Sequence, residues 1–218
     1  MNDPTLVRGP RVHLRHPVPA DRSEYVAALE RSRALLHPWV DVRLEDELID
    51  GWFASADLAD QQRLFVCRND DGALAGSYNL SQIFYGPFRN AYLGYYAFTP
   101  HAGTGLMREG MGLVLDLAFG RLGLHRIQAN IQPGNEASIA LVRGSGFRRE
   151  GFSPRYLMIG GQWRDHEQWA ITKKTSANAP GRNAPRPRPR VPKVATSGHC
   201  LAPGRGTRLR CEGEGRHR

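Results

Sequence analysis

Two glycines separated by one residue, Gly103 and Gly105, lie between a β-rich run that stops at Pro100 and a helix-like run that starts at Leu106. Glycine lets the backbone adopt left-handed conformations and approach a ligand closely. The first N–H groups of a helix have no partner within the helix, so this junction can present donors to a phosphate. The spacing also suits an ordinary tight turn. It lacks the third glycine of a dinucleotide site and the lysine of a P-loop, so neither of those sites is predicted.

The elements that must position this turn alternate between strands and helices, which predicts an α+β (mixed α/β) domain. Alternating and β-rich runs predict strands over residues 12–15, 63–68, 73–80, 90–99, 124–131, 148–155 and 166–171. Apolar residues at helical spacing predict a first helix that follows a cap at residues 19–21 and carries its apolar positions between Tyr25 and Leu36. The same spacing predicts helices over residues 45–59, 106–122 and 135–144. The segment Asn69–Gly72 is a strong hairpin signal, and Pro38 predicts a loop between the first two helices.

Charge divides the chain into two parts. The 218 residues carry a formal net charge of +9, and residues 175–218 hold ten Lys/Arg, two Asp/Glu and no aromatic residue. A segment with so few groups to bury cannot offset the entropy lost on ordering. We therefore predict a folded domain over residues 1–174 and a basic, Pro/Arg/Gly-rich disordered tail over residues 175–218. The tail is either a solvated extension or a docking segment for the ribosome, RNA or another polyanion.

Several classes of protein are disfavoured by what the sequence lacks. No stretch approaches the roughly 18 apolar residues of a membrane helix, and residues 1–16 have no apolar signal core. Cys67, Cys200 and Cys211 are too scattered for a disulfide framework or a zinc site. His125 and His166 have no third ligand type clustered with them. We expect a soluble, cytoplasmic protein with no metal and no membrane partner.

Five ordered segments resemble the GNAT superfamily of N-acetyltransferases and, within it, the ribosomal-protein-alanine N-acetyltransferases of the RimJ/RimL branch. They are GTGLMRE (103–109), LHRI (124–127), PGNEAS (133–138), GF with EG (146–151) and GQWRDH (161–166). The resemblance runs from about Val12 to Lys174. It implies the GNAT acyl-CoA N-acyltransferase fold, a twisted mixed sheet splayed after the fourth strand and flanked by helices. It also implies transfer of an acetyl group from acetyl-CoA, as co-substrate, to an amine in a ternary complex.

The resemblance also implies which residues bind the cofactor: Phe98, Ala102, Gly103, Thr104, Gly105, Leu106, Met107 and Asn135. The family's phosphate motif opens with Arg or Gln and ends with Gly or Ala, whereas this chain has Ala102 and Met107 at those positions. Main-chain N–H groups do most of the phosphate binding, so we expect cofactor binding to survive. A backbone N–H near Phe98 is expected to stabilise the oxyanion.

Reference pKa values favour an N-terminal α-amine as the acceptor. An amine of pKa near 8 is about one quarter neutral in the cytoplasm, whereas a lysine amine near 10.4 is neutral about once in a thousand. The resemblance makes Ser138 the donor to the departing thiolate, although Ser138 can equally satisfy backbone groups at a helix start. Asn135 is expected to cap that helix and to contact the pantetheine arm rather than take part in the chemistry. Relatives often carry a glutamate where this chain has Gln128. The remaining candidates for the general base are Glu150 and a water relay. Glu150 can alternatively be a surface residue that forms an ion pair.

The resemblance implies that the first two predicted helices and their loop form the acceptor wall. Trp39 in that loop either faces the substrate or packs in the core. Tyr95 and Tyr96 point to opposite faces of one strand, so one of them faces the cleft, and we assign Tyr95 to substrate binding. The predicted reaction is acetylation of the N-terminal amine of a protein, most simply a ribosomal protein.

Two other functions fit the sequence. A small amine, such as a polyamine or an amino sugar, needs a carboxylate-lined cleft, which Asp41, Glu45, Asp46, Glu47 and Asp50 can supply. A regulatory module that binds acetyl-CoA without turnover is favoured by the missing Arg/Gln and by Gln128.

Removing the predicted tail tests its assignment. A segment with few buried contacts contributes little to stability, so a chain that ends at Lys174 should melt within about two degrees of the full chain. Thermal melts of the two proteins check this, and a much larger drop contradicts the assignment. A loss of activity confined to ribosomal or nucleic-acid-bound acceptors would assign the tail a docking role.

Overall fold

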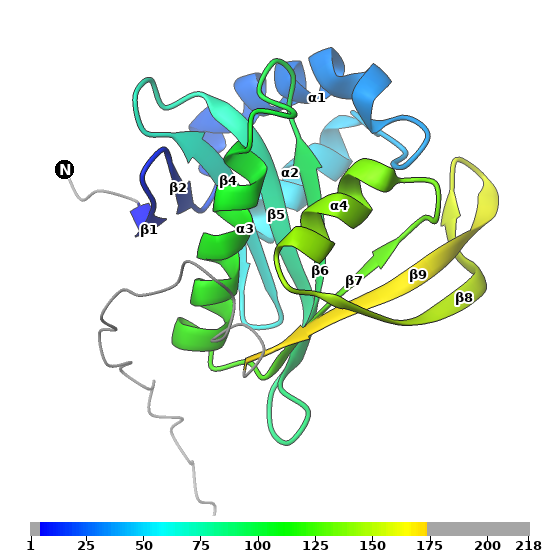
Figure 1. Cartoon of the computed structure of the whole chain (residues 1–218). Helices are drawn as coiled ribbons and strands as arrows, with labels where there is room; N and C mark the ends of the chain where they lie inside the picture. Colours follow the sequence, from blue (N-terminus) through cyan, green and yellow to red (C-terminus); the bar gives the residue numbers. More distant parts are fainter. Residues whose placement is uncertain (1–4, 174–218) are drawn as a thin grey trace, which may run out of the picture. The chain divides into compact units, whose positions relative to one another are not determined.

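The computed structural model describes residues 5–173, and the predicted tail lies outside them. In this part of the chain one sheet runs in the order β1-β2-β4-β5-β6-β7-β9-β8, with β3 paired to β4 (Figure 1). The strands are β1 (Thr5–Arg8), β2 (Val12–Arg15), β3 (Asp57–Leu58), β4 (Gln61–Arg68), β5 (Leu74–Phe84), β6 (Asn90–Ala97), β7 (Arg126–Ile131), β8 (Arg148–Ile159) and β9 (Gln162–Thr172). The helical segments are η1 (Pro19–Asp21), α1 (Arg22–Leu36), α2 (Asp46–Ala54), α3 (Leu106–Asp116), the π-helical turn η2 (Leu117–Arg121) and α4 (Glu136–Gly144).

Different helices cover the two faces of the sheet, and β4 shows why. Side chains alternate along a strand, so Leu64 and Val66 join the larger core with α3 and α4. Phe65 and Cys67 point the other way, into a smaller core with α1 and α2. Figure 1 shows α3 and α4 on the near face and α1 and α2 behind the sheet.

The sheet is split between β6 and β7. These strands run parallel, are joined through α3, and pair only over Asn90–Tyr92 and Arg126–Gln128. Beyond that point β6 continues to Ala97 and β7 to Ile131 without pairing to each other, while the remaining strand pairs are antiparallel. The predicted α+β class, with a mixed sheet that splays after the fourth predicted strand, is confirmed.

Element boundaries differ from the predictions in two helices and at the ends of several strands. The helix predicted over 45–59 ends at Ala54, where the Ser55 hydroxyl donates to the Gly51 carbonyl, and Asp57–Leu58 then pair with β4. The helix predicted over 106–122 is regular to Asp116 and finishes as a π-helical turn. Sequence patterns do not indicate β1 or the long reach of β8 and β9. The Asn69–Gly72 hairpin is confirmed as the link between β4 and β5.

The helices of residues 5–173 include none with both the length and the apolar character needed to cross a bilayer.

Gly76 determines how closely α3 packs on the sheet. A Cβ at this position would overlap the Met107 sulfur and the Tyr96 carbonyl oxygen. Gly76→Ala should therefore lower the free energy of unfolding by about 2 kcal/mol, because a packed core resists extra volume. Gly51 is the matched control: an added Cβ there meets nothing within 4 Å, so Gly51→Ala in α2 should stabilise the protein by about 0.5 to 1 kcal/mol. Urea unfolding measures both changes, and equal effects would contradict this packing.

Candidate active site

The turn between β6 and α3 has the geometry that phosphate binding requires. Gly103 and Gly105 have φ angles of 76° and 84°, in the left-handed region where a side chain is strained. Among the described residues, the backbone N–H groups from Gly103 to Met107 have no acceptor. These donors lie at the start of α3, where the helix dipole also favours an anion.

Hydrogen bonds from several elements hold the turn. The His101 N–H donates to the Phe98 carbonyl at 2.8 Å, and the Thr104 hydroxyl donates to the His101 carbonyl at 2.6 Å. The Thr99 N–H donates to the buried Ser32 hydroxyl of α1 at 2.9 Å. The turn is therefore fixed before any ligand arrives.

The side chain of Met107 points away from the turn, into the core. Its carbonyl accepts a 2.6 Å hydrogen bond from the buried Tyr78 hydroxyl, and its sulfur lies against Gly76. Leu106 is also buried. A large residue at the position of the motif's last glycine or alanine therefore does not obstruct the turn. Ala102 offers no polar side chain, so the turn itself carries no cation.

The sequence places the oxyanion donor on the strand near Phe98, and the structure shows that the N–H of Phe98 itself has another partner. Its N–H already donates to the Ala75 carbonyl at 2.9 Å, and its ring is fully buried. Because neighbouring residues of a strand direct their N–H groups to opposite edges, those of Tyr95 and Ala97 point to the edge where β7 has separated. These two groups are better placed to stabilise an oxyanion.

Asn135, Ser138 and Tyr95 form a connected group across the split. The Asn135 side chain accepts from the Ser138 N–H at 3.1 Å, which confirms Asn135 as the cap of α4. The Ser138 hydroxyl is then left for another role and lies 2.5 Å from the Tyr95 hydroxyl. Burial raises the pKa of Tyr95 to about 12, against a smaller lowering by the Ser138 hydrogen bond. Tyr95 therefore stays protonated and can donate to Ser138.

Glu150 is exposed on β8 and is held by an arginine. Its two carboxylate oxygens accept from Arg126 at 2.9 and 2.5 Å. This hydrogen bonding lowers the pKa of Glu150, and partial burial opposes the shift. A carboxylate stabilised in this way is a weak proton acceptor. Gln128 lies next to the pair, with its amide oxygen 3.4 Å from Arg126.

The predicted acceptor wall, made of α1, α2 and the loop between them, lies on the opposite face of the sheet. Tyr96, and not Tyr95, lines a cavity of about 160 Å³ there, together with Tyr25, Val40, Asp41, Arg43 and Trp52. Trp39 is half-buried and packs against the β7–α4 loop, where its ring would lie 3.3 Å from a Cβ on Gly134. Its carbonyl accepts from Gln132 at 3.1 Å. Trp39 thus joins the loop to the segment that leads into α4.

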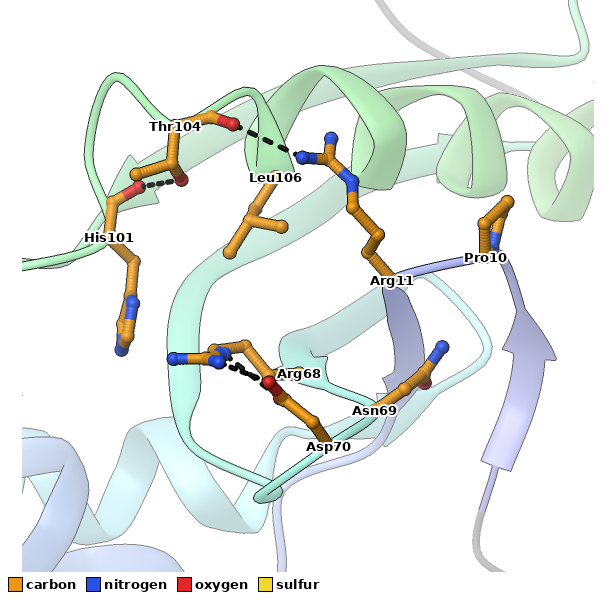
Figure 2. A pocket seen from close by; sticks show the side chains of 8 residues that line it. All are labelled: Pro10, Arg11, Arg68, Asn69, Asp70, His101, Thr104 and Leu106. Carbon is orange, nitrogen blue, oxygen red and sulfur yellow. Dashed lines mark hydrogen bonds and ion pairs between the residues drawn. The ribbon is translucent and has the colours of Figure 1, made fainter.

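Two structural features near the turn and on β7 escape the sequence patterns. One is a ladder on β7, where Gln128 donates to Asn130 at 3.0 Å and Asn130 donates to Tyr156 at 3.0 Å. The other is a cavity of about 450 Å³ beside the turn, lined in part by Arg11, Arg68 and His101 (Figure 2). Both join residues far apart in the sequence, so no local signal indicates them.

His166 is buried, its pKa is lowered by that burial, and its Nδ1 lies 3.0 Å from the Arg164 carbonyl. Within the described residues no group of three His, Cys, Asp or Glu side chains is placed to hold a metal ion.

Residues 11–148 match the family model of the acetyltransferase (GNAT) domain. The chain is 35% identical over 159 residues to the ribosomal protein uS5-alanine N-acetyltransferase of Escherichia coli, a match that covers 69% of this chain and 81% of that protein. It is 40% identical over 101 residues to the probable N-acetyltransferase YjcK of Bacillus subtilis, covering 46% of this chain and 56% of that relative.

Two solved structures of similar fold bear names that point to different acceptors. Mycobacterium smegmatis RimJ in complex with CoA-disulfide superposes with a TM-score of 0.69 at 28% identity, over 76% of this chain and 87% of that one. Spermidine N-acetyltransferase from Vibrio cholerae, in complex with CoA and spermine, superposes with a TM-score of 0.67 at 24% identity, over 77% and 98% of the two chains. The second likeness is one of fold alone.

Proposed function

We propose, from the premise that this chain belongs to the GNAT family of acetyltransferases, that it transfers an acetyl group from acetyl-CoA to the N-terminal α-amine of a protein. The E. coli relative, named for acetylation of a ribosomal protein's alanine, makes a ribosomal protein the first acceptor to test. The group transferred is carried as a thioester, and the chain's own residues bind, orient and donate protons.

The unpaired N–H groups of the turn fit the phosphates of coenzyme A. Each residue from Gly103 to Met107 would contribute a backbone N–H donor rather than a side chain. The pantetheine arm would then run from the turn toward Ser138 along the edge of β6 that β7 leaves unpaired, with Asn135 beside it.

Two sets of donors would act during the transfer. Attack of the amine on the thioester carbonyl places negative charge on oxygen, which the N–H groups of Tyr95 and Ala97 can stabilise. The carbon–sulfur bond then breaks, and the sulfur leaves as a thiolate whose pKa is near that of cysteine, about 8.5. The Ser138 hydroxyl can donate to it, with the proton of Tyr95 in turn directed at Ser138. The excess proton of the amine passes to solvent or to a weak base.

The pairing of acidic side chains near α2 is the observation that carries the choice of acceptor. Asp46 and Asp50 both pair with Arg22, and Glu45 pairs with Arg43 at 2.9 Å. The cavity beside Tyr96 is lined by one carboxylate, Asp41, together with one guanidinium, Arg43. A polyamine needs several free carboxylates, whereas a peptide N-terminus brings one charge.

The surface of β7 on the acceptor side supports the same acceptor class. Its ladder of Gln128, Asn130 and Tyr156 offers neutral donors and acceptors, which match peptide groups better than cations. Glu150 adds little negative charge because Arg126 neutralises it. A weak base of this kind is sufficient for an α-amine that is already partly neutral.

An amine panel tests this acceptor assignment. Thiol release from acetyl-CoA should be at least about a hundredfold faster, as kcat/KM, on a peptide with free N-terminal alanine than on spermidine or on the same peptide with a blocked N-terminus and an internal lysine. Faster turnover of spermidine would establish the small-amine alternative. Tight acetyl-CoA binding with no thiol release on any amine would establish the non-catalytic one.

Ser138 and Tyr95 should act on turnover more than on binding. Ser138→Ala should lower kcat by about 10²-fold and Tyr95→Phe by about tenfold, with KM for acetyl-CoA nearly unchanged, because both groups act on the departing thiolate. Ser145→Ala, which removes a hydroxyl bonded to the Leu141 carbonyl on the same helix, is the control and should leave kcat unchanged. Steady-state kinetics and melts on one preparation compare them. Turnover of Ser138→Ala within threefold of the parent would exclude the catalytic role.

A further inference from the structure

An arginine from the N-terminal hairpin reaches the phosphate turn from the side of the cavity beside it. Arg11 lies in the loop between β1 and β2, and its guanidinium donates to the Thr104 carbonyl at 3.3 Å (Figure 2). The same guanidinium would lie 3.4 Å from a Cβ on Gly105. A cation therefore lies against the turn, although the turn's own sequence supplies none.

Glu109, in the first turn of α3, fixes the position of this arginine. Its carboxylate accepts from the Arg11 N–H at 2.7 Å, from Arg11 Nε at 2.9 Å and from the Val12 N–H at 3.1 Å. Partial burial opposes ionisation of Glu109, but these hydrogen bonds outweigh it and lower its pKa. The hairpin and the start of α3 are thus joined through one charged group.

The hydrogen bond from Arg11 to the Thr104 carbonyl also affects the Gly105 N–H, which belongs to the same peptide group. A trans peptide is planar, with its C=O and N–H pointing in opposite directions, so the Gly105 N–H points away from Arg11. A guanidinium on the carbonyl oxygen fixes that plane and polarises it, which strengthens the N–H as a donor. We propose that Arg11 is a positioning residue that orients and polarises the Thr104–Gly105 peptide for the phosphates of coenzyme A. This inference rests on the proposed use of acetyl-CoA.

The second arginine of the cavity has no such role. Arg68 pairs with Asp70 and, at 3.4 Å, with Asp71 on its own hairpin (Figure 2). None of its recorded bonds within the described residues reaches the turn. Arg68 therefore serves as the matched control for a change of charge in the same cavity.

The test compares Arg11→Ala, Arg11→Lys and Arg68→Ala in the full chain. Loss of a charge-assisted hydrogen bond should raise the Kd for coenzyme A and the KM for acetyl-CoA about tenfold in Arg11→Ala, with kcat within twofold. Arg11→Lys keeps a charged donor and should recover most of the affinity. Arg68→Ala should match the parent. The effect should be the same with dephospho-coenzyme A, because the turn is expected to hold the pyrophosphate and not the ribose phosphate.

Calorimetry, steady-state kinetics and melts without ligand separate the outcomes. Parental affinity in a folded Arg11→Ala protein would overturn the proposal. Equal losses in Arg11→Ala and Arg68→Ala that disappear with dephospho-coenzyme A would also overturn it, because they would mean that the cavity binds the terminal phosphate directly. If Arg11→Ala does not fold, Arg11→Met, which keeps the apolar stem but has no donor, takes its place. A raised Kd for coenzyme A with normal kcat in Arg11→Met supports the proposal, and parental affinity in that variant overturns it. Failure of the parent to bind coenzyme A would instead refute the proposed function.

Discussion

Five consecutive backbone N–H groups, from Gly103 to Met107, meet no acceptor among residues 5–173, and the surrounding elements are arranged to keep them so. Such groups are costly to leave unpaired unless water or a ligand meets them. They stay available here because Gly103 and Gly105 hold left-handed conformations and because neighbouring elements fix the turn. Ser32 of α1 holds it on one side and Arg11 on the other, while Tyr78 and Gly76 hold the first residues of α3 on the sheet. Cofactor binding through main-chain groups explains how the turn can lack a basic side chain.

The split between β6 and β7 lies between this turn and the Tyr95–Ser138 pair that we propose acts on the thiolate. Only a short stretch of parallel pairing connects the two strands, so the last residues of β6 keep one edge free. Alternation along that strand sends Tyr95 to Ser138 on one face and Tyr96 to the cavity on the other. Thiolate departure and amine entry can therefore be served from opposite faces of one strand. The arginine-paired carboxylates near α2 leave the acceptor face with little net negative charge, which bears on the kind of amine it can admit.

Local patterns predict what local interactions decide. The Asn69–Gly72 hairpin, the Asn135 cap and the glycine turn are each fixed by residues within a few positions of one another, and the structure has all three. Local sequence patterns do not predict contacts between residues that are far apart in the chain. The Phe98 N–H is taken by Ala75, the predicted end of α2 gives way to pairing with β4, and alternation could not say which of Tyr95 and Tyr96 faces Ser138. Arg11 is 93 residues from Thr104, and no pattern in the sequence indicates that contact.

A crystal structure of the chain with coenzyme A tests the central claim most directly, namely that the turn holds the phosphates and the split leads the sulfur to Ser138. We expect pyrophosphate oxygens within about 3.2 Å of the N–H groups of Gly103 to Met107. We also expect the pantetheine arm between β6 and β7, with the sulfur beside the Ser138 hydroxyl. Phosphates seated in the cavity between Arg68 and His101, or a sulfur remote from Ser138, would contradict this claim.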